Sequence, residues 1–313
     1  MTESMLLGIR VVAPLFLLMA LGYGMRRLGL ADLDFFNKLN SLIFKVFLPV
    51  MLFNSVYTSD FSAAFQPRLV LLAVGLVSAT FALSSVLNYV LVKDPARRGV
   101  IIQGECRTNY VLFGIPVAIS LFGADQVGIT AVLIAFVVPL FNLYSTIVLE
   151  MNRGSKVPVG KVLLAIATNP LIDATLIAFL FMAVGLRLPG VIETAVTDVS
   201  SVATPLAIIV LGGTFRFSRV GHNRAALAVV VAAKLVLLPL IFVGSAALLG
   251  LRGVELGAFL AMSASPTAVS SFPMAQQMGG DGELAGQVVV MTTAFSMVTL
   301  FVWVTCLSGL GLL

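Results

Sequence analysis

The sequence predicts an all-α polytopic membrane protein whose ten transmembrane helices form two inverted repeats of five. The first observation is composition, since 59% of the 313 residues are hydrophobic and only 11% are charged, whereas soluble domains carry roughly 25% charged residues. The second is a series of apolar stretches near the length of about 20 residues that a spanning helix needs. The third is a repeat, because Pro14 and Pro49 recur as Pro170 and Pro205 half a chain length later.

The apolar stretches place the candidate helices along the chain. They cover residues 5–26, 35–57, 68–92, 97–122, 126–150, 160–186, 191–214, 224–250, 254–278 and 284–311. The first five spans make up repeat 1–152, and the last five make up repeat 153–313. Because each half holds an odd number of spans, the second half must enter the membrane from the opposite face. Paired inverted halves are typical of secondary transporters, whose binding sites lie where the halves meet.

The basic residues predict the orientation of the chain. Lys and Arg gather in the loops after spans one, three, five and seven, for example Arg26, Arg98 and Arg216. Cytoplasmic loops carry an excess of these residues, so we expect both termini on the outer side. The net charge of +5 is then explained by membrane topology and does not indicate nucleic-acid binding. The first apolar stretch carries Arg10 and precedes further spans, which favours a spanning helix over a cleavable signal.

Spans four and nine are unusually polar, and they occupy equivalent places in the two halves. Span four contains Asn109, Gly114 and Pro116, and span nine contains Pro266 and Pro273. A proline inside a helix removes a backbone hydrogen bond, and a membrane tolerates the break only where it is buried in protein or lines a watery cavity. We therefore expect two broken helices that cross near the middle of the bilayer. Their half-helix N-termini would suit an anionic group of a substrate.

A substrate is expected between the two breaks. Asn109 is the first candidate, because an amide can donate to a carboxylate and accept from a hydroxyl or N–H group, although it could instead cap a half-helix. Arg107 could attract a carboxylate, or its side chain could extend to the membrane interface. The expected substrate-binding residues are Asn109, Pro116, Arg107, Ser265, Pro266, Thr267, Pro49 and Pro205.

Three further charged residues are candidates for coupling transport to an ion. Glu105 is a candidate proton carrier, because a charged side chain at membrane depth is a functional hypothesis by default. Lys234 in span eight needs an acidic or carbonyl partner, and a fixed ammonium there would replace a coupling sodium ion. Asp173 follows Asn169-Pro170 and could either cap that helix or contact the substrate.

Other classes of protein are disfavoured. The single histidine, His222, lies in a basic loop, so neither histidine-based catalysis nor a metal cluster is expected. Cys106 and Cys306 fall inside apolar segments and indicate no disulfide framework. No cofactor is expected. A channel stays open as an alternative, because broken helices also build pores, but the chain shows no repeated filter sequence.

Four stretches of the chain resemble motifs of a known family. The most specific begins at Cys106 and reads CRTNYVLFGIPVA, which is similar to the fourth-span motif of the auxin efflux carrier family. The others read FLPVMLF from Phe47, TNPL from Thr168 and ASPTA from Ala264. The family includes plant auxin carriers and bacterial permeases proposed to move carboxylates. This chain resembles the short bacterial members, because only about Met151 to Gly160 join its halves.

The resemblance implies a fold shared with bile acid sodium symporters and some sodium/proton antiporters. It implies a scaffold domain from spans 1, 2, 6 and 7, a transport domain from spans 3–5 and 8–10, an elevator-type motion and a homodimer. It places the chain in the bacterial inner membrane with periplasmic termini, and Pro49 and Pro205 on the scaffold wall of the site. The expected function is secondary active transport of small organic anions, either auxin-like compounds or mono- and dicarboxylates. A sodium-coupled symporter of bile acid-like or other organic anions is the alternative.

Overall fold

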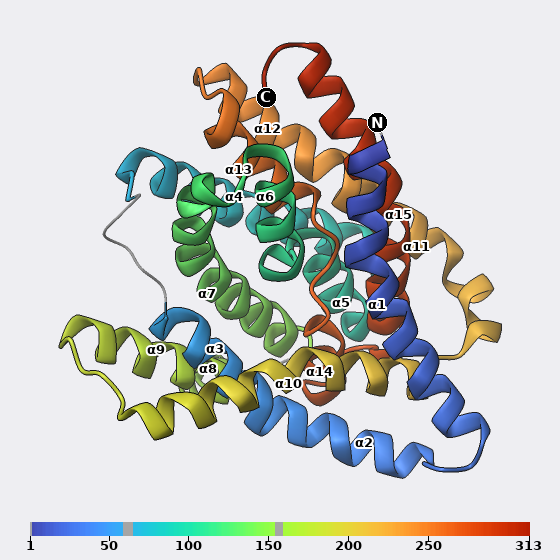
Figure 1. The fold of residues 1–313 in the computed structure, drawn as a ribbon. Helices are drawn as coiled ribbons and strands as arrows, with labels where there is room; N and C mark the ends of the chain where they lie inside the picture. Colours follow the sequence, from blue (N-terminus) through green and yellow to red (C-terminus); the bar gives the residue numbers. More distant parts are fainter. Residues whose placement is uncertain (1, 59–64, 154–158) are drawn as a thin grey trace.

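The chain folds into a bundle of helices, shown by a computed structural model that describes residues 2–58, 65–153 and 159–313 (Figure 1). Within those ranges every regular element is helical apart from one isolated β-bridge. The α-helices are α1 (Thr2–Arg27), α2 (Leu33–Leu42), α3 (Leu48–Tyr57), α4 (Pro67–Leu91), α5 (Pro95–Cys106), α6 (Ile115–Phe122), α7 (Gly128–Met151), α8 (Val159–Ala167), α9 (Pro170–Ala183), α10 (Gly190–Thr214), α11 (Arg224–Ala232), α12 (Leu238–Leu248), α13 (Gly253–Ala264), α14 (Ser271–Gln277) and α15 (Gly282–Gly309). Short π or 3-10 turns are η1 (Ile43–Phe47), η2 (Tyr110–Gly114), η3 (Ala124–Gln126), η4 (Phe217–Asn223) and η5 (Ala233–Leu237).

The lengths of the helices fit a polytopic membrane protein. Six helical stretches in the described ranges are long and apolar enough to cross a membrane, namely Leu33–Tyr57, Pro67–Leu91, Gly128–Met151, Gly190–Thr214, Val220–Leu248 and Gly282–Gly309. Three shorter apolar helices cover Tyr110–Phe122, Pro170–Ala183 and Gly253–Ala264. The predicted sixth span is interrupted where the sequence reads Asn169-Pro170, so that α8 and α9 are separate helices. Part of the loop expected between the two halves, residues 154–158, lies outside the described residues.

Three π-helical turns have a common cause in the sequence. The turns η1, η2 and η5 are each followed by a Leu-Pro or Ile-Pro pair that contains Pro49, Pro116 or Pro239. Proline has no N–H to give to the preceding turn, and its ring clashes with the carbonyl of residue i−4. The wider π turn accommodates that clash without ending the helix. The prolines therefore shape these helices and break only some of them.

Small residues bring the first and tenth α-helices into close contact. The Cα of Gly22 packs so tightly on α10 that an added Cβ would overlap the carbonyl oxygen of Ile209. The Cα of Gly212 packs in the same way on the carbonyl oxygen of Met19 in α1. Glycine at a helix contact lets two backbones approach closely, as is common in membrane helix packing. The pair α1–α10 is therefore held together along the backbone itself.

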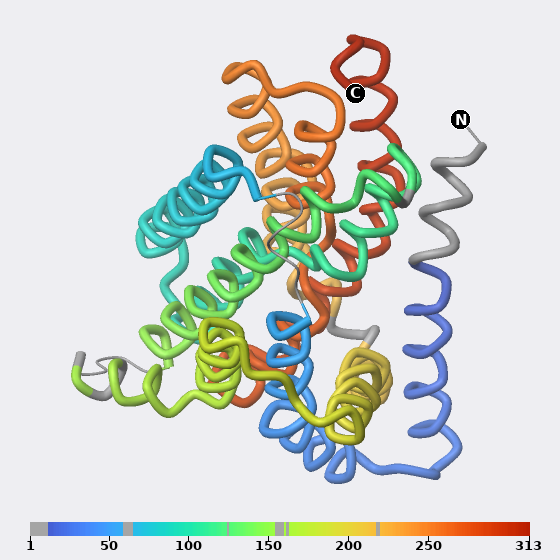
Figure 2. The backbone as a smooth tube through the Cα atoms, turned by 60° about the vertical axis from the view of Figure 1, so that its left-hand side comes forward, coloured from blue at the N-terminus to red at the C-terminus, as the bar shows by residue number. Residues whose placement is uncertain are grey.

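Most of the helices pack around one of two large apolar cores. One core is built mainly from α4, α7, α12 and α13, and the other mainly from α1, α2, α10, α14 and α15. A smaller cluster joins α3 to α9. Both views place α2, α3, α9 and α10 at one end of the molecule and α12 at the other (Figures 1 and 2). The two interrupted segments, predicted spans four and nine, run through the interior between the helices at the two ends.

Candidate functional site

Predicted spans four and nine are both interrupted, and their interruptions pair with each other. In span four, the backbone is helical up to the end of α5, extended at Arg107, and enters the π turn η2 after Asn109. In span nine, the backbone is non-helical between the end of α13 and the start of α14. Thr108 and Thr267 form an antiparallel β-bridge, and the backbone N–H of Asn109 donates to the carbonyl oxygen of Pro266 over 2.8 Å. The unwound backbone groups thus satisfy one another, as buried backbone must.

Side chains reinforce this crossing. The hydroxyl of Thr267 donates to the carbonyl oxygen of Gly104 in the last turn of α5 over 2.8 Å, and its backbone N–H donates to the hydroxyl of Thr292 on α15 over 3.2 Å. Thr267 is fully buried. A hydroxyl that bonds the end of the opposite half-helix takes up one of the carbonyls that a helix terminus leaves unpaired. Thr267 is therefore a structural residue of the crossing.

Arg107 is a buried cation inside the break. Its side chain is only 4% exposed, and one guanidinium nitrogen donates to the amide oxygen of Asn142 on α7 and to the hydroxyl of Ser270, both over 2.7 Å. The other terminal nitrogen lies against the sulfur of Met274. No carboxylate in the described part of the chain comes within 4.0 Å of this guanidinium. A buried charge held only by neutral partners is expensive unless an opposite charge joins it.

Two polar groups beside Arg107 lack hydrogen-bond partners. Among the described residues, the side-chain nitrogen of Asn109 and the hydroxyl of Thr108 are buried and accept or donate no hydrogen bond. The Asn109 side chain is 8% exposed. Leaving a buried donor unsatisfied costs about 1–3 kcal/mol, so such groups in a native protein require an explanation. A ligand with acceptor oxygens would satisfy them.

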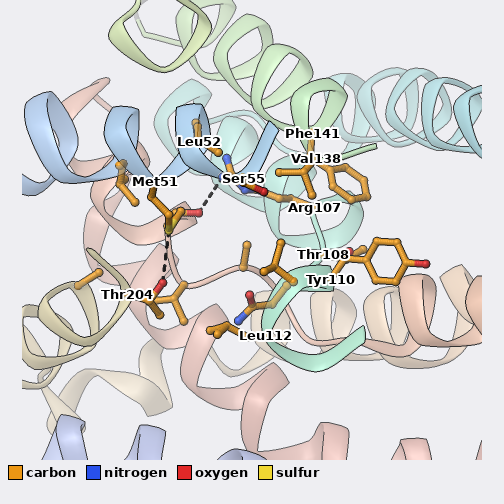
Figure 3. Close-up of a pocket in the computed structure, with 17 residues that line it drawn as sticks. Met51, Leu52, Ser55, Arg107, Thr108, Tyr110, Leu112, Val138, Phe141 and Thr204 are labelled. Atoms are coloured by element: carbon orange, nitrogen blue, oxygen red, sulfur yellow. Dashed lines mark hydrogen bonds between the residues drawn. The ribbon is translucent and has the colours of Figure 1, made fainter. Parts of the chain in front are cut away.

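A cavity of about 90 Å³ connects these groups to the neighbouring helices. It is lined by Leu48, Met51, Leu52 and Ser55 of α3, Arg107–Leu112 of the first break, Val138 and Phe141 of α7, Thr204 and Ala207 of α10, and Ala268–Ser270 of the second break. Figure 3 shows the labelled α3 side chains and Thr204 on one side, Val138 and Phe141 on the other, and Arg107 between them. The wall is largely hydrocarbon, and its polar groups concentrate at the first break.

The predicted substrate-binding residues fall into two groups. Arg107 and Asn109 line the cavity, whereas the crossing places Ser265, Pro266 and Thr267 behind its wall. Ser265 donates its hydroxyl back to the carbonyl oxygen of Ala261 within α13.

The other predicted prolines shape helices around the cavity. Pro116 starts α6, Pro49 starts α3, and Pro205 lies inside α10. None of the three lines the cavity among the described residues, but the neighbours Met51 and Thr204 do. Each proline therefore acts on the shape of a lining helix or on the break.

Glu105 faces away from the Arg107 cavity. Its carboxylate accepts from the hydroxyl of Ser84 over 2.5 Å and from the amide of Asn88 over 2.9 Å, both on α4. It lines a separate cavity of about 60 Å³ between α4, α5 and the η5–α12 helix. Glu105 and Arg107, two positions apart in span four, thus line two different cavities.

The remaining coupling candidates occupy two further places. Lys234 on η5 is fully buried, and its ammonium donates to the carbonyl oxygen of Ser263 over 3.3 Å, in the last turn of α13. A cation there lies at the favourable, negative end of a helix dipole. Asp173 lies in the first turn of α9 and is not among the residues that line the cavity. The described residues contain no cluster of three or more His, Cys, Asp or Glu side chains that could hold a metal ion.

Several residues of this site were not singled out from the sequence. Asn142 on α7 holds the guanidinium of Arg107, and Met51, Phe141 and Thr204 form the wall. Ser270 belongs to the polar stretch of span nine, which was the available signal for it. An asparagine in the middle of an apolar span was the signal for Asn142, because such a residue needs a partner.

Fold and site together define a polytopic helical membrane protein with a cation-bearing cavity at two interrupted helices. Residues 7–304 match the family described as Membrane transport protein, the auxin efflux carrier family, and the chain belongs to that family. It is 25% identical over 296 residues to a protein of Methanothermobacter thermautotrophicus that is described as an uncharacterized transporter, an alignment that covers 93% of this chain and 96% of that protein. The chain is thus a membrane transport protein and not an enzyme.

Proposed function

We propose that this protein is a secondary active carrier of small organic anions that works by an elevator-type alternating-access mechanism. The observation that carries the proposal is the position of Arg107, a buried cation without a carboxylate partner among the described residues, on the wall of the cavity. Thr108 and Asn109 add unpartnered polar atoms in the next two residues. A carboxylate offers the negative charge and the acceptor oxygens that this set lacks.

The proposed moving parts follow the walls of the cavity. We assign α1–α3 and α8–α10 to a scaffold domain, and α4–α7 and α11–α15 to a transport domain. Supporting this division, α3 packs against α9 and α10, α1 packs against α10, and the cavity has α3 and α10 on one side and the two breaks with α7 on the other. If each interrupted segment crosses the membrane once, the helices make ten spans in two inverted repeats.

The proposed setting is a bacterial inner membrane with both termini on the periplasmic side. The enrichment of Lys and Arg in alternate loops supports this orientation. We expect the carrier to assemble as a homodimer, as the family resemblance implies.

Binding of carboxylates to the purified protein tests the proposal. Thermal-shift measurements in detergent with a panel of carboxylates are expected to show stabilisation, because a ligand that binds only the folded state raises its stability. Asn109→Ala is expected to abolish that shift while the protein stays folded. Asn109→Asp keeps the shape of the side chain, replaces its donor with a negative charge and should have the same effect. Gln126→Ala removes an exposed amide away from the cavity and is the matched control. Unchanged affinity in purified Asn109→Ala would show that the site is assigned wrongly.

Sodium coupling is tested in the same assay. The ammonium of Lys234 lies at the carbonyl end of α13, where it would take the place of a coupling cation. We therefore expect carboxylate binding to be equal in sodium and in potassium. Stabilisation by sodium alone would instead favour a sodium symporter. Flux into proteoliposomes that saturates with substrate distinguishes a carrier from a channel, whose flux would not need a conformational cycle.

A further inference from the structure

We propose that the cavity selects monocarboxylates with a short apolar body and rejects dicarboxylates of the same length. This inference rests on the proposed function, because it names the substrate class of the same site. It follows from the number of charges that face the cavity, from the apolar chemistry of the rest of its lining and from its volume.

A single positive charge faces the cavity. Among the described residues, Arg107 is the one charged side chain that lines it. The other buried cation nearby, Lys234, is fully enclosed and bonded to the carbonyl oxygen of Ser263, away from the lining. One guanidinium carries one positive charge and therefore balances the charge of one carboxylate. A second carboxylate on the same substrate would find no cation.

Away from Arg107, the lining of the cavity would offer a second carboxylate no cation and mostly hydrocarbon. Its apolar groups are mainly the side chains of Leu48, Leu52, Val138, Phe141, Ala207 and Val269. The hydroxyl of Thr204 is already engaged, since it lies 3.6 Å from the sulfur of Met51. Moving an unpaired ionised carboxylate against hydrocarbon is strongly unfavourable, whereas moving a methyl group there is favourable. The polar end and the apolar body of the cavity therefore match an amphipathic monoanion.

The volume restricts the length of that anion. An apolar protein cavity of about 150 Å³ holds one benzene molecule. By that measure, the cavity of about 90 Å³ admits an apolar body of roughly four carbon atoms. The three-carbon chain of butyrate fits within this limit when its carboxylate is placed at Arg107.

Butyrate and succinate form a matched pair for the test, since they have the same four-carbon chain and differ by one carboxylate. Their dissociation constants for the purified wild-type protein are measured by calorimetry at pH 7.5, where both acids are fully ionised. We expect butyrate to bind at least tenfold more tightly than succinate. Equal or tighter binding of succinate overturns the inference and leaves the proposed function standing. If no carboxylate of any kind binds, the proposed function itself fails.

A second cation on the apolar wall should reverse the selectivity. Met51→Lys places an ammonium on α3 facing the cavity, and we expect succinate to gain at least tenfold relative to butyrate. Met51→Leu preserves the apolar wall and should retain the wild-type preference. A folded Met51→Lys protein that still prefers butyrate counts against the charge argument. If Met51→Lys does not fold, the wild-type comparison alone decides.

Discussion

Thr108 and Thr267 pair as an isolated antiparallel β-bridge, although 158 intervening residues separate them in the chain. This bridge joins the two interrupted helices and places Arg107 and Asn109 on the wall of one cavity. The elevator-type carrier proposed here would need a rigid site that moves as a unit, and the cross-bonded backbone would supply that rigidity without a continuous helix. The stability of the crossing is therefore expected to depend on few side chains.

The hydroxyl of Thr267 is the first of these side chains. Thr267→Val removes the donor to the carbonyl oxygen of Gly104 while keeping the shape, so that a buried carbonyl loses its partner. We expect a loss of about 1–3 kcal/mol of unfolding free energy. The apparent melting temperature in detergent measures the effect, and Thr267→Ser, which retains the hydroxyl, should stay close to wild type. Equal melting of the Val and Ser variants would show that the bond contributes nothing.

The contact between α1 and α10 should be intolerant of even one added methyl group. Gly22→Ala would place a Cβ into the carbonyl oxygen of Ile209, which forces the helices apart at a cost of about 1–3 kcal/mol. Gly24→Ala adds the same group two residues later, where nothing lies within 4 Å of the new Cβ. Melting of the two variants in detergent is the measurement. The prediction is wrong if Gly22→Ala is as stable as Gly24→Ala.

Gln276 on α14 ties the proposed transport domain to α2 of the proposed scaffold. Its amide oxygen accepts from Asn40 over 2.7 Å, and its amide nitrogen donates to Asn37 over 2.8 Å. An elevator motion must break this link, so holding it closed should stop transport. Cysteines at Asn37 and Gln276, in a Cys306→Ser background, are joined by a short cross-linker that attaches to each thiol through a reducible disulfide, and this link is expected to arrest flux in proteoliposomes.

Two controls accompany this cross-link. Cleaving the cross-linker with a reductant should restore flux, and the Asn37→Cys single variant should be unaffected by the reagent. Flux at the wild-type rate through a fully cross-linked protein would exclude relative motion of α2 and α14.

Glu105 is expected to carry a coupling proton without binding the substrate. Its carboxylate lines a different cavity from Arg107 and is held by Ser84 and Asn88. Glu105→Gln keeps the size of the side chain but cannot exchange a proton. We therefore expect unchanged carboxylate affinity and a loss of the pH dependence of flux. Asp198→Asn, which alters an exposed residue of α10, is the matched control. Wild-type pH dependence in Glu105→Gln would remove this residue from the coupling mechanism.

Local signals predicted much of the architecture. Apolar runs predicted where the long helices lie, because helix length and hydrophobicity are properties of contiguous sequence. The combination of polarity and proline in spans four and nine predicted both interruptions, and it directed attention to Arg107 and Asn109. These inferences hold because a helix break in an apolar segment has few causes, and each cause is visible in neighbouring residues.

The lining of the cavity could not be predicted in the same way. Pro49 and Pro205 lie on helices that contribute to the cavity, but the side chains that line it there include those of Met51 and Thr204. A proline and its effect on a helix can be recognised in a sequence. Which side of a helix faces a cavity, in contrast, depends on how the helix is rotated against its neighbours. Periodicity gives little help here, since lipid and protein interior are both apolar.

By itself, the sequence determined that this chain is a helical membrane protein with two breaks at corresponding positions. The tertiary structure alone decided that the breaks pair with each other, and that Asn142 and Ser270 hold the guanidinium of Arg107. The physical reason is the separation along the chain over which each effect acts. Burial in lipid and helix breaking act on adjacent residues, whereas the partners of a buried charge come from segments 35 and 163 positions away along the chain.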